Sequence, residues 1–430
     1  MLTSLVLNKM HSNNARLISL NILYGVFKED KQPNKLLNEL SNTKAMSKSD
    51  IAFVFKMVYG TIQYKIYLEY VVNKIIKPNK TNYKIQLLLW LNLYQIKFLN
   101  TPQYSVNNEA VEVAKIIDNN LAGFVNATTK KLANLDLWKV DIKNNQNKIP
   151  LEYGFPFWLY KSLEQDYSKE IALQIVQSSN NQTMFSFRVN ENKISQIEFE
   201  KLYKHKFNLK KSKIAKNCYL TDFNIINTQV FDQGLVFIQD ETSILAVELL
   251  DLEKQSKVID MCCAPGGKLS YIASLVDKKN LVDAFEINEN KKNIIYSNLN
   301  RLGINNVNIE FKSALNINKK YERILLDAPC SGFGVLKRKP DIKLKKFSKK
   351  DMDALYQLQF DLLQKGFEHL LDEGILVYST CTINKKENQN QIKVFLDNNK
   401  NAKLIFEKQF FGFEGNNNGF YIAKIKKLKK

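Results

Sequence analysis

The feature that most constrains the fold of this chain is a series of short apolar segments that alternate with helical segments. Strands are predicted at KVIDM (257–261), LVDAFEI (281–287), VNIEF (307–311), RILLDA (323–328) and ILVYST (375–380). Helical segments follow the first two strands, and a long helix is predicted near 351–371. Strands that are apolar throughout are buried on both faces, and their alternation with helices is typical of a doubly wound, mostly parallel sheet. We therefore predict an α/β fold for residues 233–430.

The N-terminal third has a different pattern, in which apolar residues recur largely at spacings of three and four. Such segments occur at residues 15–27, 51–62, 85–94 and 106–117. Glycine and proline are sparse inside them, as uninterrupted helices require. Residues 1–142 are therefore predicted to form an all-helical bundle.

The middle of the chain combines both patterns. It follows a polar stretch, KNNQNK (143–148), that is typical of a linker. FPFWLYKSL (155–163) favours a helix, whereas MFSFRVN (184–190) alternates between apolar and polar residues like a strand. Residues 148–232 are therefore predicted to form a small α+β unit between the other two parts.

The charge balance is the first indication of a partner. The 430 residues include 63 Lys and Arg against 43 Asp and Glu, which gives a net charge of +20. A surplus of this size attracts polyanions, of which RNA and DNA are the usual ones. The chain is also rich in Lys, Asn and Ile, as proteins of AT-rich genomes are. Charge alone therefore leaves both nucleic-acid binding and compositional bias open.

The remaining composition favours a soluble protein of a reducing cytoplasm. No apolar run approaches the length of a membrane span, and the N-terminal MLTSLVLNKMHSNN lacks a small-residue cleavage site. The 5 cysteines do not suggest a disulfide framework. His11, His205 and His369 are scattered, so no metal site is predicted, and nothing in the sequence requires more than a monomer.

The first motif is VIDMCCAPGGK (258–268), in which a strand runs into a glycine-rich turn before a helix. Glycines at this point allow the backbone to approach a ligand at the carboxyl end of the strand. The turn is not GxGxxG and does not indicate a dinucleotide. Glu286 ends the next strand, 19 residues after Gly267, where a carboxylate can accept hydrogen bonds from two ribose hydroxyls. Together these features favour a nucleoside cofactor such as S-adenosylmethionine, although an ordinary strand–turn–helix junction also has them.

Two further motifs place cysteines at the ends of sheet strands. LLDAPCSGFG (325–334) carries Asp327 and Cys330, and LVYSTCT (376–382) carries Cys381. The carboxyl ends of the strands of a doubly wound sheet face one cleft, so we expect the two thiols to meet at the cofactor. A single cysteine is usually a small buried hydrophobe, but two at matching strand ends favour chemistry. Packing is the prediction for the others, which are Cys218, Cys262 and Cys263.

Two thiols beside such a cofactor fit methyl transfer to carbon-5 of a pyrimidine. That carbon becomes nucleophilic when a thiolate adds to carbon-6 and gives it enamine character. After methyl transfer a base must remove the carbon-5 proton while the thiol is eliminated, and a second thiol or a nearby carboxylate can act as that base. Asp327 is placed to share a proton with ring nitrogen-3. The target base must also leave its stack to be reached.

Several of these segments resemble a known family. APGGK, DAPCSGFGVLKRKPDIK and STCTINKKENQNQI resemble the RNA cytosine-C5 methyltransferases, and the chain from roughly residue 12 to 424 resembles the Sun/RsmB branch, which methylates 16S ribosomal RNA of the small subunit. VYGTIQ, NEAVEVAK and GFVNATTKKL resemble its NusB-like helical RNA-binding domain, and FPFWL and FRVN resemble its linking segment. The resemblance implies a Rossmann-like methyltransferase domain at 233–430, S-adenosylmethionine as cofactor and ribosomal RNA as partner.

The resemblance also implies roles for individual residues. Cys381 in the Thr-Cys motif is the expected nucleophile, Cys330 in the Pro-Cys motif assists product release, and Asp327 contacts the target base. The residues expected to bind the cofactor are Cys263, Ala264, Pro265, Gly266, Gly267, Lys268, Glu286, Ser313 and Asp327. Ser313 is a departure, because the family usually has an Asp after the third strand, and it puts the adenosine contacts in question.

A methyltransferase for 16S ribosomal RNA is the leading hypothesis, and two kinds of alternative remain. DNA carbon-5 enzymes take their nucleophile from the Pro-Cys motif, so Cys381 favours RNA, with tRNA or another RNA as alternative substrates. The departure at Ser313 favours a non-catalytic RNA-binding factor in ribosome assembly, whereas Cys330, Cys381 and Glu286 favour an enzyme.

Overall fold

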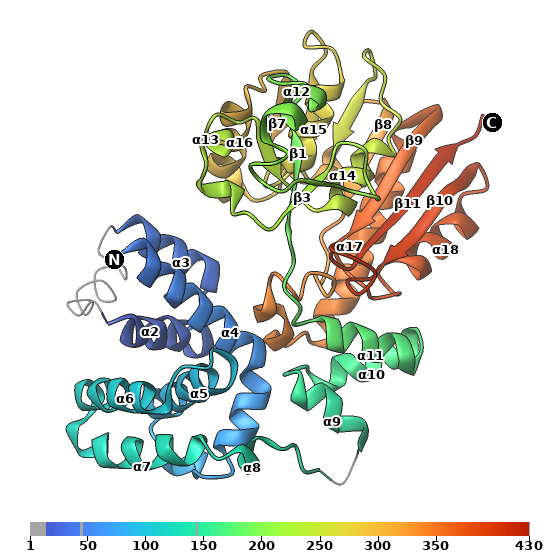
Figure 1. The fold of residues 1–430 in the computed structure, drawn as a ribbon. Coiled ribbons are helices and arrows are strands. Elements are labelled where there is room, and N and C mark those ends of the chain that lie inside the picture. The colour runs from blue at the N-terminus through green and yellow to red at the C-terminus, as the bar shows by residue number, and fades with distance from the viewer. Residues whose placement is uncertain (1–13, 44–45, 143–144, 430) are drawn as a thin grey trace. The chain divides into compact units, whose positions relative to one another are not determined.

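The computed structural model describes residues 14–43, 46–142 and 145–429 of the chain. It divides into two compact units (Figure 1). The helical unit contains the chain up to Asn180 together with the segment Lys339–Lys345, and the sheet unit contains Asn181–Arg338 and Lys346–Lys430. Within the described ranges, no helix has both the length and the apolar character that crossing a membrane requires.

The helical unit is built from short and medium-length helices. They are α2 (Ala15–Lys28), α3 (Pro33–Asn42), α4 (Lys48–Val72), α5 (Tyr83–Phe98), α6 (Gln103–Ile117), α7 (Ala122–Leu132), α8 (Leu135–Trp138), α9 (Asn145–Glu152), α10 (Phe157–Asp166) and α11 (Lys169–Ser178). Several of these helices are capped at the N-terminus by a polar side chain that accepts hydrogen bonds from the backbone N–H groups of the first turn. Asn14 does so for α2, Ser47 for α4 and Asn82 for α5.

Helix α5 is the centre of this bundle. Every residue from Ile85 to Gln95 is buried, because α2, α4, α6 and α7 all pack against the helix. A helix that is apolar around its whole circumference occupies such a position. Gly60 on α4 lies directly against Tyr94, and a Cβ at residue 60 would come within 1.9 Å of the Tyr94 ring. The predicted helical bundle is therefore confirmed for the residues that the structure describes.

The segment Lys339–Lys345 joins the helical unit from the C-terminal half of the chain. It contains the 3-10 helix η6 (Pro340–Leu344), which packs against α4. The side chain of Lys343 is 2% exposed, and its ammonium donates hydrogen bonds to Oδ1 of Asn180 at 2.8 Å and Oγ of Ser179 at 3.2 Å. Burial lowers the pKa of Lys343 to about 7, because a low-dielectric interior disfavours the charged form.

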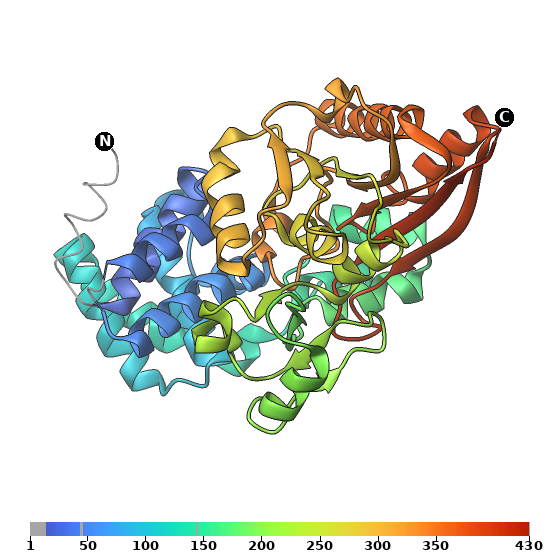
Figure 2. The same ribbon diagram turned by 90° about the horizontal axis from the view of Figure 1, so that it is seen from above.

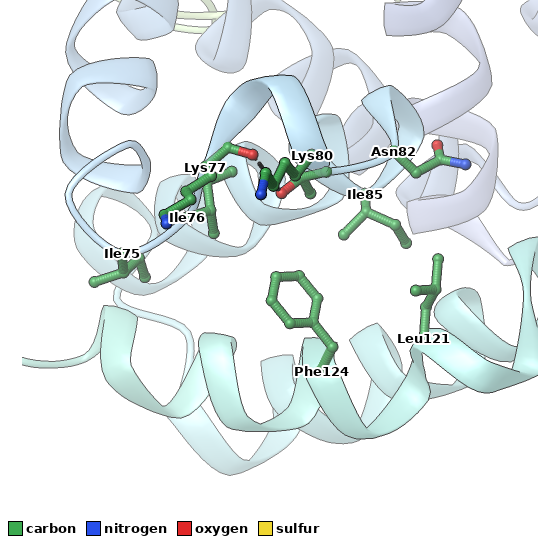
Figure 3. Close-up of a pocket in the computed structure, with 9 residues that line it drawn as sticks. Ile75, Ile76, Lys77, Lys80, Asn82, Ile85, Leu121 and Phe124 are labelled. Atoms are coloured by element: carbon green, nitrogen blue, oxygen red, sulfur yellow. Dashed lines mark hydrogen bonds between the residues drawn. The ribbon is translucent and has the colours of Figure 1, made fainter.

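A pocket of about 310 Å³ opens on the helical unit (Figure 3). Phe124 on α7 points toward the segment that carries Lys77 and Lys80, and Ile76 and Ile85 add apolar walls. Both lysines and Phe124 are exposed. The pocket therefore combines an apolar interior with a positively charged rim.

The sheet unit begins with a small antiparallel sheet. Its order is β2 (Lys210–Lys211), β3 (Tyr219–Thr221), β1 (Phe185–Val189) and β4 (Val236–Ile238), and Phe199 of α12 (Gln196–Tyr203) packs into its core. The strand predicted at 184–190 is confirmed as β1. Strand β1 carries the buried Arg188, whose guanidinium donates to Oε1 of Gln239, Oγ of Ser270 and the carbonyl of Gly267. The small sheet thereby supports the glycine-rich turn of the larger sheet.

The larger sheet has seven strands in the order β10-β11-β9-β8-β5-β6-β7. Their bounds are β5 (Val258–Asp260), β6 (Val282–Phe285), β7 (Val307–Glu310), β8 (Tyr321–Asp327), β9 (Leu370–Thr380), β10 (Ala402–Phe410) and β11 (Phe420–Lys427). Strands β5 to β9 pair in parallel, and β10 and β11 add an antiparallel edge, which is red in Figure 2. The chain runs outward from β5 to β7 and returns to β8 beside β5, so the switch point lies between β5 and β8.

Helices cover both faces of this sheet. One apolar core joins it to α14 (Glu241–Glu248), α15 (Gly267–Leu275) and α16 (Lys292–Leu302), and the other joins it to α17 (Lys349–Glu368) and α18 (Gln389–Asn398). The five predicted strands and the long predicted helix are all present. The Rossmann-like, doubly wound sheet is therefore confirmed, and its antiparallel edge of β10 and β11 is an addition that the sequence pattern did not predict.

The structure differs from the sequence predictions in the linker at residues 143–148 and in the way the chain divides into units. Of the predicted linker 143–148, Lys143 and Asn144 lie outside the described residues, and Asn145–Lys148 form the start of α9, so this part is helical and the prediction was wrong there. The two compact units also differ from the predicted division, since residues 148–180 group with the helical unit and 181–232 with the sheet unit. The three-part division stays a prediction. The predictions for the N-terminal segment and for His11 fall on residues 1–13, outside the described ranges.

Candidate active site

The predicted site residues meet at the carboxyl ends of β5, β6, β8 and β9. A pocket of about 280 Å³ lies there, beside the switch point of the sheet. Among the residues that line it are Ala264, Glu286, Ser313, Asp327, Cys330 and Cys381. These residues come from five separate segments of the sequence, so the common pocket supports the expectation that the strand ends form one cleft.

The glycine-rich turn forms one side of this region. Gly266 has a φ of +96°, a conformation that side chains other than glycine adopt only with strain. A Cβ at Gly267 would lie 2.7 Å from the ring of Phe237, so this position also requires glycine. A second pocket of about 170 Å³ lies on the turn and is lined by residues that include Gln239, Cys263, Pro265, Gly267, Lys268 and Asp327. The turn therefore requires glycine at both positions, and a pocket lies beside it.

Glu286 follows β6 directly and is almost completely buried. Its Oε1 accepts hydrogen bonds from the backbone N–H of Asn288 at 2.9 Å and from the ammonium of Lys291 at 3.2 Å. Ser313 lines the same pocket and accepts a hydrogen bond from the N–H of Leu315. Ser313 thus places an uncharged hydroxyl at this wall of the pocket.

Asp327 ends β8 and is held by two neighbours. Its Oδ2 accepts from the ammonium of Lys268 at 2.8 Å, and its Oδ1 accepts from Oγ of Ser379 on β9, also at 2.8 Å. Burial opposes the charge of Lys268, but the carboxylates of Asp327 and Asp260 nevertheless hold the pKa of Lys268 above its usual value. A fixed carboxylate and a permanent positive charge therefore lie side by side at the bottom of the site.

The two predicted cysteines meet in the same pocket. Sγ of Cys330 lies 3.3 Å from Sγ of Cys381, and the two cysteines are not joined by a disulfide. The hydrogen bond to Cys381 and then burial raise the pKa of Cys330 well above its ordinary value. The raised pKa favours the protonated form of Cys330, and in the contact between the two sulfur atoms either one can be the donor.

The other three cysteines behave differently. Burial raises the pKa of Cys218, Cys262 and Cys263, and Cys218 and Cys263 pack into an apolar core of the sheet unit. A buried thiol with a raised pKa is a poor nucleophile. Cys262 also lines both pockets and Cys263 lines the smaller one, so the packing role of these residues stays a prediction.

Sequence reasoning missed Asp260, the last residue of β5. Its carboxyl group is completely buried, and burial, with Asp327 as the next cause, raises the pKa of Asp260 to about 7. One oxygen accepts from the N–H of Cys262, and Oδ2 has no hydrogen-bond partner among the described residues. The signal was present in the motif VIDM, since an acidic residue there ends the strand next to the switch point.

The basic residues Lys337, Arg338 and Lys339 follow the loop of Cys330, and two of the three bind other parts of the protein. Lys337 donates to the carbonyl of Gly412, and Arg338 forms an ion pair with Asp240 at 3.4 Å. Only Lys339 of these three is exposed. His205 and His369 belong to no group of metal-ligating side chains, and the residues that the structure describes contain no such group.

Comparison with known proteins identifies the family. Probable ribosomal RNA small subunit methyltransferase B of Bacillus subtilis (strain 168) is 32% identical over 400 residues, and the match covers 90% of this chain and 89% of that protein. The chain belongs to the 16S rRNA methyltransferase RsmB/F family. A second relative in the RsmB/F family, ribosomal RNA small subunit methyltransferase B of Vibrio vulnificus (strain YJ016), is 29% identical and covers 96% of this chain and 99% of its own.

A solved structure agrees with this assignment. A methyltransferase homolog protein from Pyrococcus horikoshii is 32% identical, with a TM-score of 0.59, and covers 67% of this chain and 100% of its own. The RsmB/F methyltransferase model matches residues 247–426, the NusB family model matches 13–134, and the ferredoxin-like domain of RsmF/B-like methyltransferases matches 155–220. The predicted family, the NusB-like helical region and the methyltransferase fold are therefore confirmed. The RsmB/F model includes both cysteines, the glycine-rich turn and Asp260.

Proposed function

We propose that this chain transfers a methyl group from S-adenosylmethionine to carbon-5 of a cytosine in 16S ribosomal RNA, through a covalent adduct with Cys381. One observation carries the proposal. The thiols of Cys330 and Cys381 lie 3.3 Å apart beyond the ends of the neighbouring parallel strands β8 and β9, in a pocket that also holds Glu286. The relatives named as small-subunit ribosomal RNA methyltransferases support the choice of RNA.

The residues present fit S-adenosylmethionine. A pocket of about 170 Å³ borders the turn at Pro265, Gly267 and Lys268, and Oδ2 of Asp260 at the end of β5 is a buried oxygen without a hydrogen-bond partner among the described residues. Glu286 would hold the ribose hydroxyls, and Ser313 would contact the adenosine side. When bound, the cofactor supplies an electrophilic methyl group.

Cys381 would act as the nucleophile on the target base. The positive charge of Lys268 interacts with Cys381 and favours its thiolate form. As Sγ of Cys381 forms a bond to carbon-6, the carbon-5–carbon-6 double bond opens and carbon-5 gains the electron pair that takes the methyl group. Asp327, fixed by Lys268 and Ser379, would share a proton with ring nitrogen-3 and stabilise this adduct.

Cys330 would act in the second half of the reaction. Its pKa is raised first by the hydrogen bond to Cys381, and a Cys381 sulfur bonded to carbon-6 no longer carries the negative charge that holds this proton. Cys330 therefore becomes easier to ionise, and it would release its proton to solvent at the stage when a base is needed. Its thiolate takes the carbon-5 proton, the electrons of that bond restore the double bond, and Cys381 leaves as a thiolate.

RNA binding would involve the helical unit. The exposed Lys77 and Lys80 border an apolar pocket that contains the exposed ring of Phe124 (Figure 3). Lysines bind phosphates without reading sequence, and exposed aromatic rings stack on unpaired bases. The net charge of +20 adds long-range attraction for RNA.

The test is methyl transfer from tritiated cofactor to small-subunit RNA that lacks the modification, followed by bisulfite mapping. We expect label at carbon-5 of cytosine with the wild-type chain and none with Cys381→Ala. Transfer to tRNA alone would change the substrate, and transfer to DNA or protein would contradict the proposal. RNA binding without any transfer by the wild type would favour the non-catalytic assembly factor.

A further inference from the structure

The sheet unit buries a further carboxylate, that of Glu387, which the mechanism above does not use. Glu387 lies between β9 and α18 and is 0% exposed. Its oxygens accept hydrogen bonds from the N–H of Ser331 at 2.8 Å, Oγ of Ser331 at 2.6 Å, Nε2 of Gln359 at 3.0 Å and Nδ2 of Asn384 at 3.0 Å. A longer contact from Oγ1 of Thr382 measures 3.4 Å. The buried Glu387 side chain therefore accepts hydrogen bonds from several separate segments of the chain.

These donors stand next to the reacting groups. Ser331 follows Cys330, and Thr382 follows Cys381, so the same carboxylate contacts the neighbour of each thiol. The hydroxyls of Ser331 and Thr382 also lie 2.8 Å apart. Gln359 of α17 donates to Glu387 and, from the same nitrogen, to the carbonyl of Pro329 at 2.8 Å. The loop after β8, the loop after β9 and helix α17 are thus joined at Glu387.

The number of donors explains why a carboxylate stands here. An ionised glutamate is acceptor-only and offers about four lone-pair positions, whereas an amide of the same shape would turn an N–H group toward other N–H or O–H groups. Hydrogen bonds to a charged acceptor are also stronger than neutral ones, and a buried network of this kind is rigid only when all members are paired. A substitution by Gln therefore conserves the volume but breaks the pairing.

We infer that Glu387 is the positioning residue of the two-thiol centre, whose carboxylate holds the loops of Cys330 and Cys381 so that the two sulfur atoms stay in contact. This inference rests on the proposed function for its catalytic meaning. The pKa of Cys330 is raised first by the hydrogen bond to Cys381 and then by burial. The negative charge of Glu387 near Cys330 is a smaller cause of the same shift. Glu387 thus orients the two loops and also favours the protonated form of Cys330, while Cys381 acts as the nucleophile.

The test compares Glu387→Gln with a matched control, Glu248→Gln. Glu248 is also a multiple acceptor in the sheet unit, taking hydrogen bonds from the N–H groups of Lys216 and Asn217 and from the hydroxyl of Tyr271, but it contacts neither cysteine loop. The first readout needs no RNA: the rates at which iodoacetamide alkylates Cys330 and Cys381 are measured by peptide mass spectrometry from pH 6 to 9. The second readout is kcat and KM for methyl transfer to RNA.

In the wild type we expect Cys381 to react at least about tenfold faster than Cys330, because the thiolate is the reactive form. In Glu387→Gln this ratio should approach one, and the pH profile of Cys330 should move to lower pH. In Glu387→Gln, kcat should fall roughly a hundredfold and KM for RNA should change by no more than about twofold. A misplaced reacting group slows the chemical step more than it weakens substrate binding. Glu248→Gln should match the wild type in both readouts.

Ser331→Ala keeps the inference testable if Glu387→Gln does not fold. It removes only the hydroxyl donor and should shift the alkylation ratio in the same direction by a smaller factor, and Glu387→Asp should restore part of the ratio. Unchanged alkylation and unchanged kcat in Glu387→Gln would overturn the positioning role. A shifted alkylation ratio in a chain whose wild type transfers no methyl group to RNA would uphold the positioning role and reject the proposed function.

Discussion

The two units of this protein bury different kinds of polar groups. In the helical unit the buried polar side chains within the described residues are neutral, such as Asn92 and Thr129, with the single exception of Lys343. The sheet unit buries four carboxylates, of Glu241, Asp260, Glu286 and Glu387, together with Arg188 and Lys424. Both units have large apolar cores, so the difference does not come from a lack of hydrophobic residues.

The difference indicates where the chemistry is located. Burial of a charge is expensive unless partners and hydrogen bonds compensate for it, so a fold retains buried charges where they have a task. In the sheet unit Glu286 lines the pocket that holds the two thiols, and Glu387 accepts a hydrogen bond from Ser331, next to Cys330, whereas Arg188, Glu241 and Lys424 do not line this pocket. The helical unit has an interior of largely neutral packing, with Lys343 as the buried charge among its described residues.

The largest expected effect concerns the two thiols of the sheet unit. Cys381→Ala should reduce methyl transfer at least roughly a thousandfold, because the nucleophile is lost, while RNA binding stays unchanged. Cys330→Ala should still attack and transfer the methyl group but stall before release. Denaturing gel electrophoresis should therefore show a covalent protein–RNA band for Cys330→Ala and none for Cys381→Ala.

A reversed pattern of bands would assign the nucleophile to Cys330 and contradict the proposed mechanism. Full activity in both variants would make the thiols core residues. In that case the comparison between the two units would lose its meaning, since the buried charges of the sheet unit would surround no reaction.

An intermediate effect is expected for the buried carboxylate at the cofactor pocket. Glu286→Ala should weaken binding of S-adenosylmethionine roughly ten- to a hundredfold, because hydrogen bonds to a charged group are worth about 1.5–3 kcal/mol. Isothermal titration calorimetry measures this directly. Glu289→Ala, at an exposed position three residues further along, is the control and should bind like the wild type. Equal affinity in both variants would remove Glu286 from the cofactor site.

The smallest effect concerns Lys343, the one buried charge of the described helical unit. Its pKa is lowered to about 7, so between pH 7 and the ordinary lysine range the unfolded chain binds more protons than the folded one. The contribution of Lys343 to the free energy of unfolding therefore becomes more favourable as the pH rises, by about 1 kcal/mol from pH 7 to 8. This contribution is absent in Lys343→Met, so the stability difference between wild type and variant should change by that amount.

Thermal unfolding at the two pH values measures the change as a shift of roughly 2–4 °C. Lys345→Met, which alters an exposed lysine of the same segment, should differ from the wild type equally at both values. Cofactor affinity should be the same in all three proteins. A pH-independent difference for Lys343→Met would mean that its ammonium is solvated, and a loss of cofactor affinity would give the helical unit a share in the chemistry.

Local patterns predicted much of the fold and most of the candidate site. The parallel strands from β5 to β9 were identified because they are apolar throughout and are followed by turns or helices. Strands β10 and β11 were missed, because β10 lies at the edge of the sheet and carries many exposed polar residues. Asp260 was quoted within its motif but not assigned a role, since its unpaired oxygen is visible only in three dimensions.

The order of residues along the chain determined which fold class is possible and which side chains can carry the chemistry, because periodicity, glycine turns and strand-end cysteines are local properties. Tertiary structure alone decided which of those side chains meet. Ser331 and Glu387 are 56 positions apart, yet their hydrogen bond measures 2.8 Å. Lys337 and Arg338 are bound internally, and Lys343 is buried in the other unit, although their sequence is simply basic. The physical reason is that burial and hydrogen-bond pairing depend on neighbours that the fold brings together, and the sequence near a residue does not contain them.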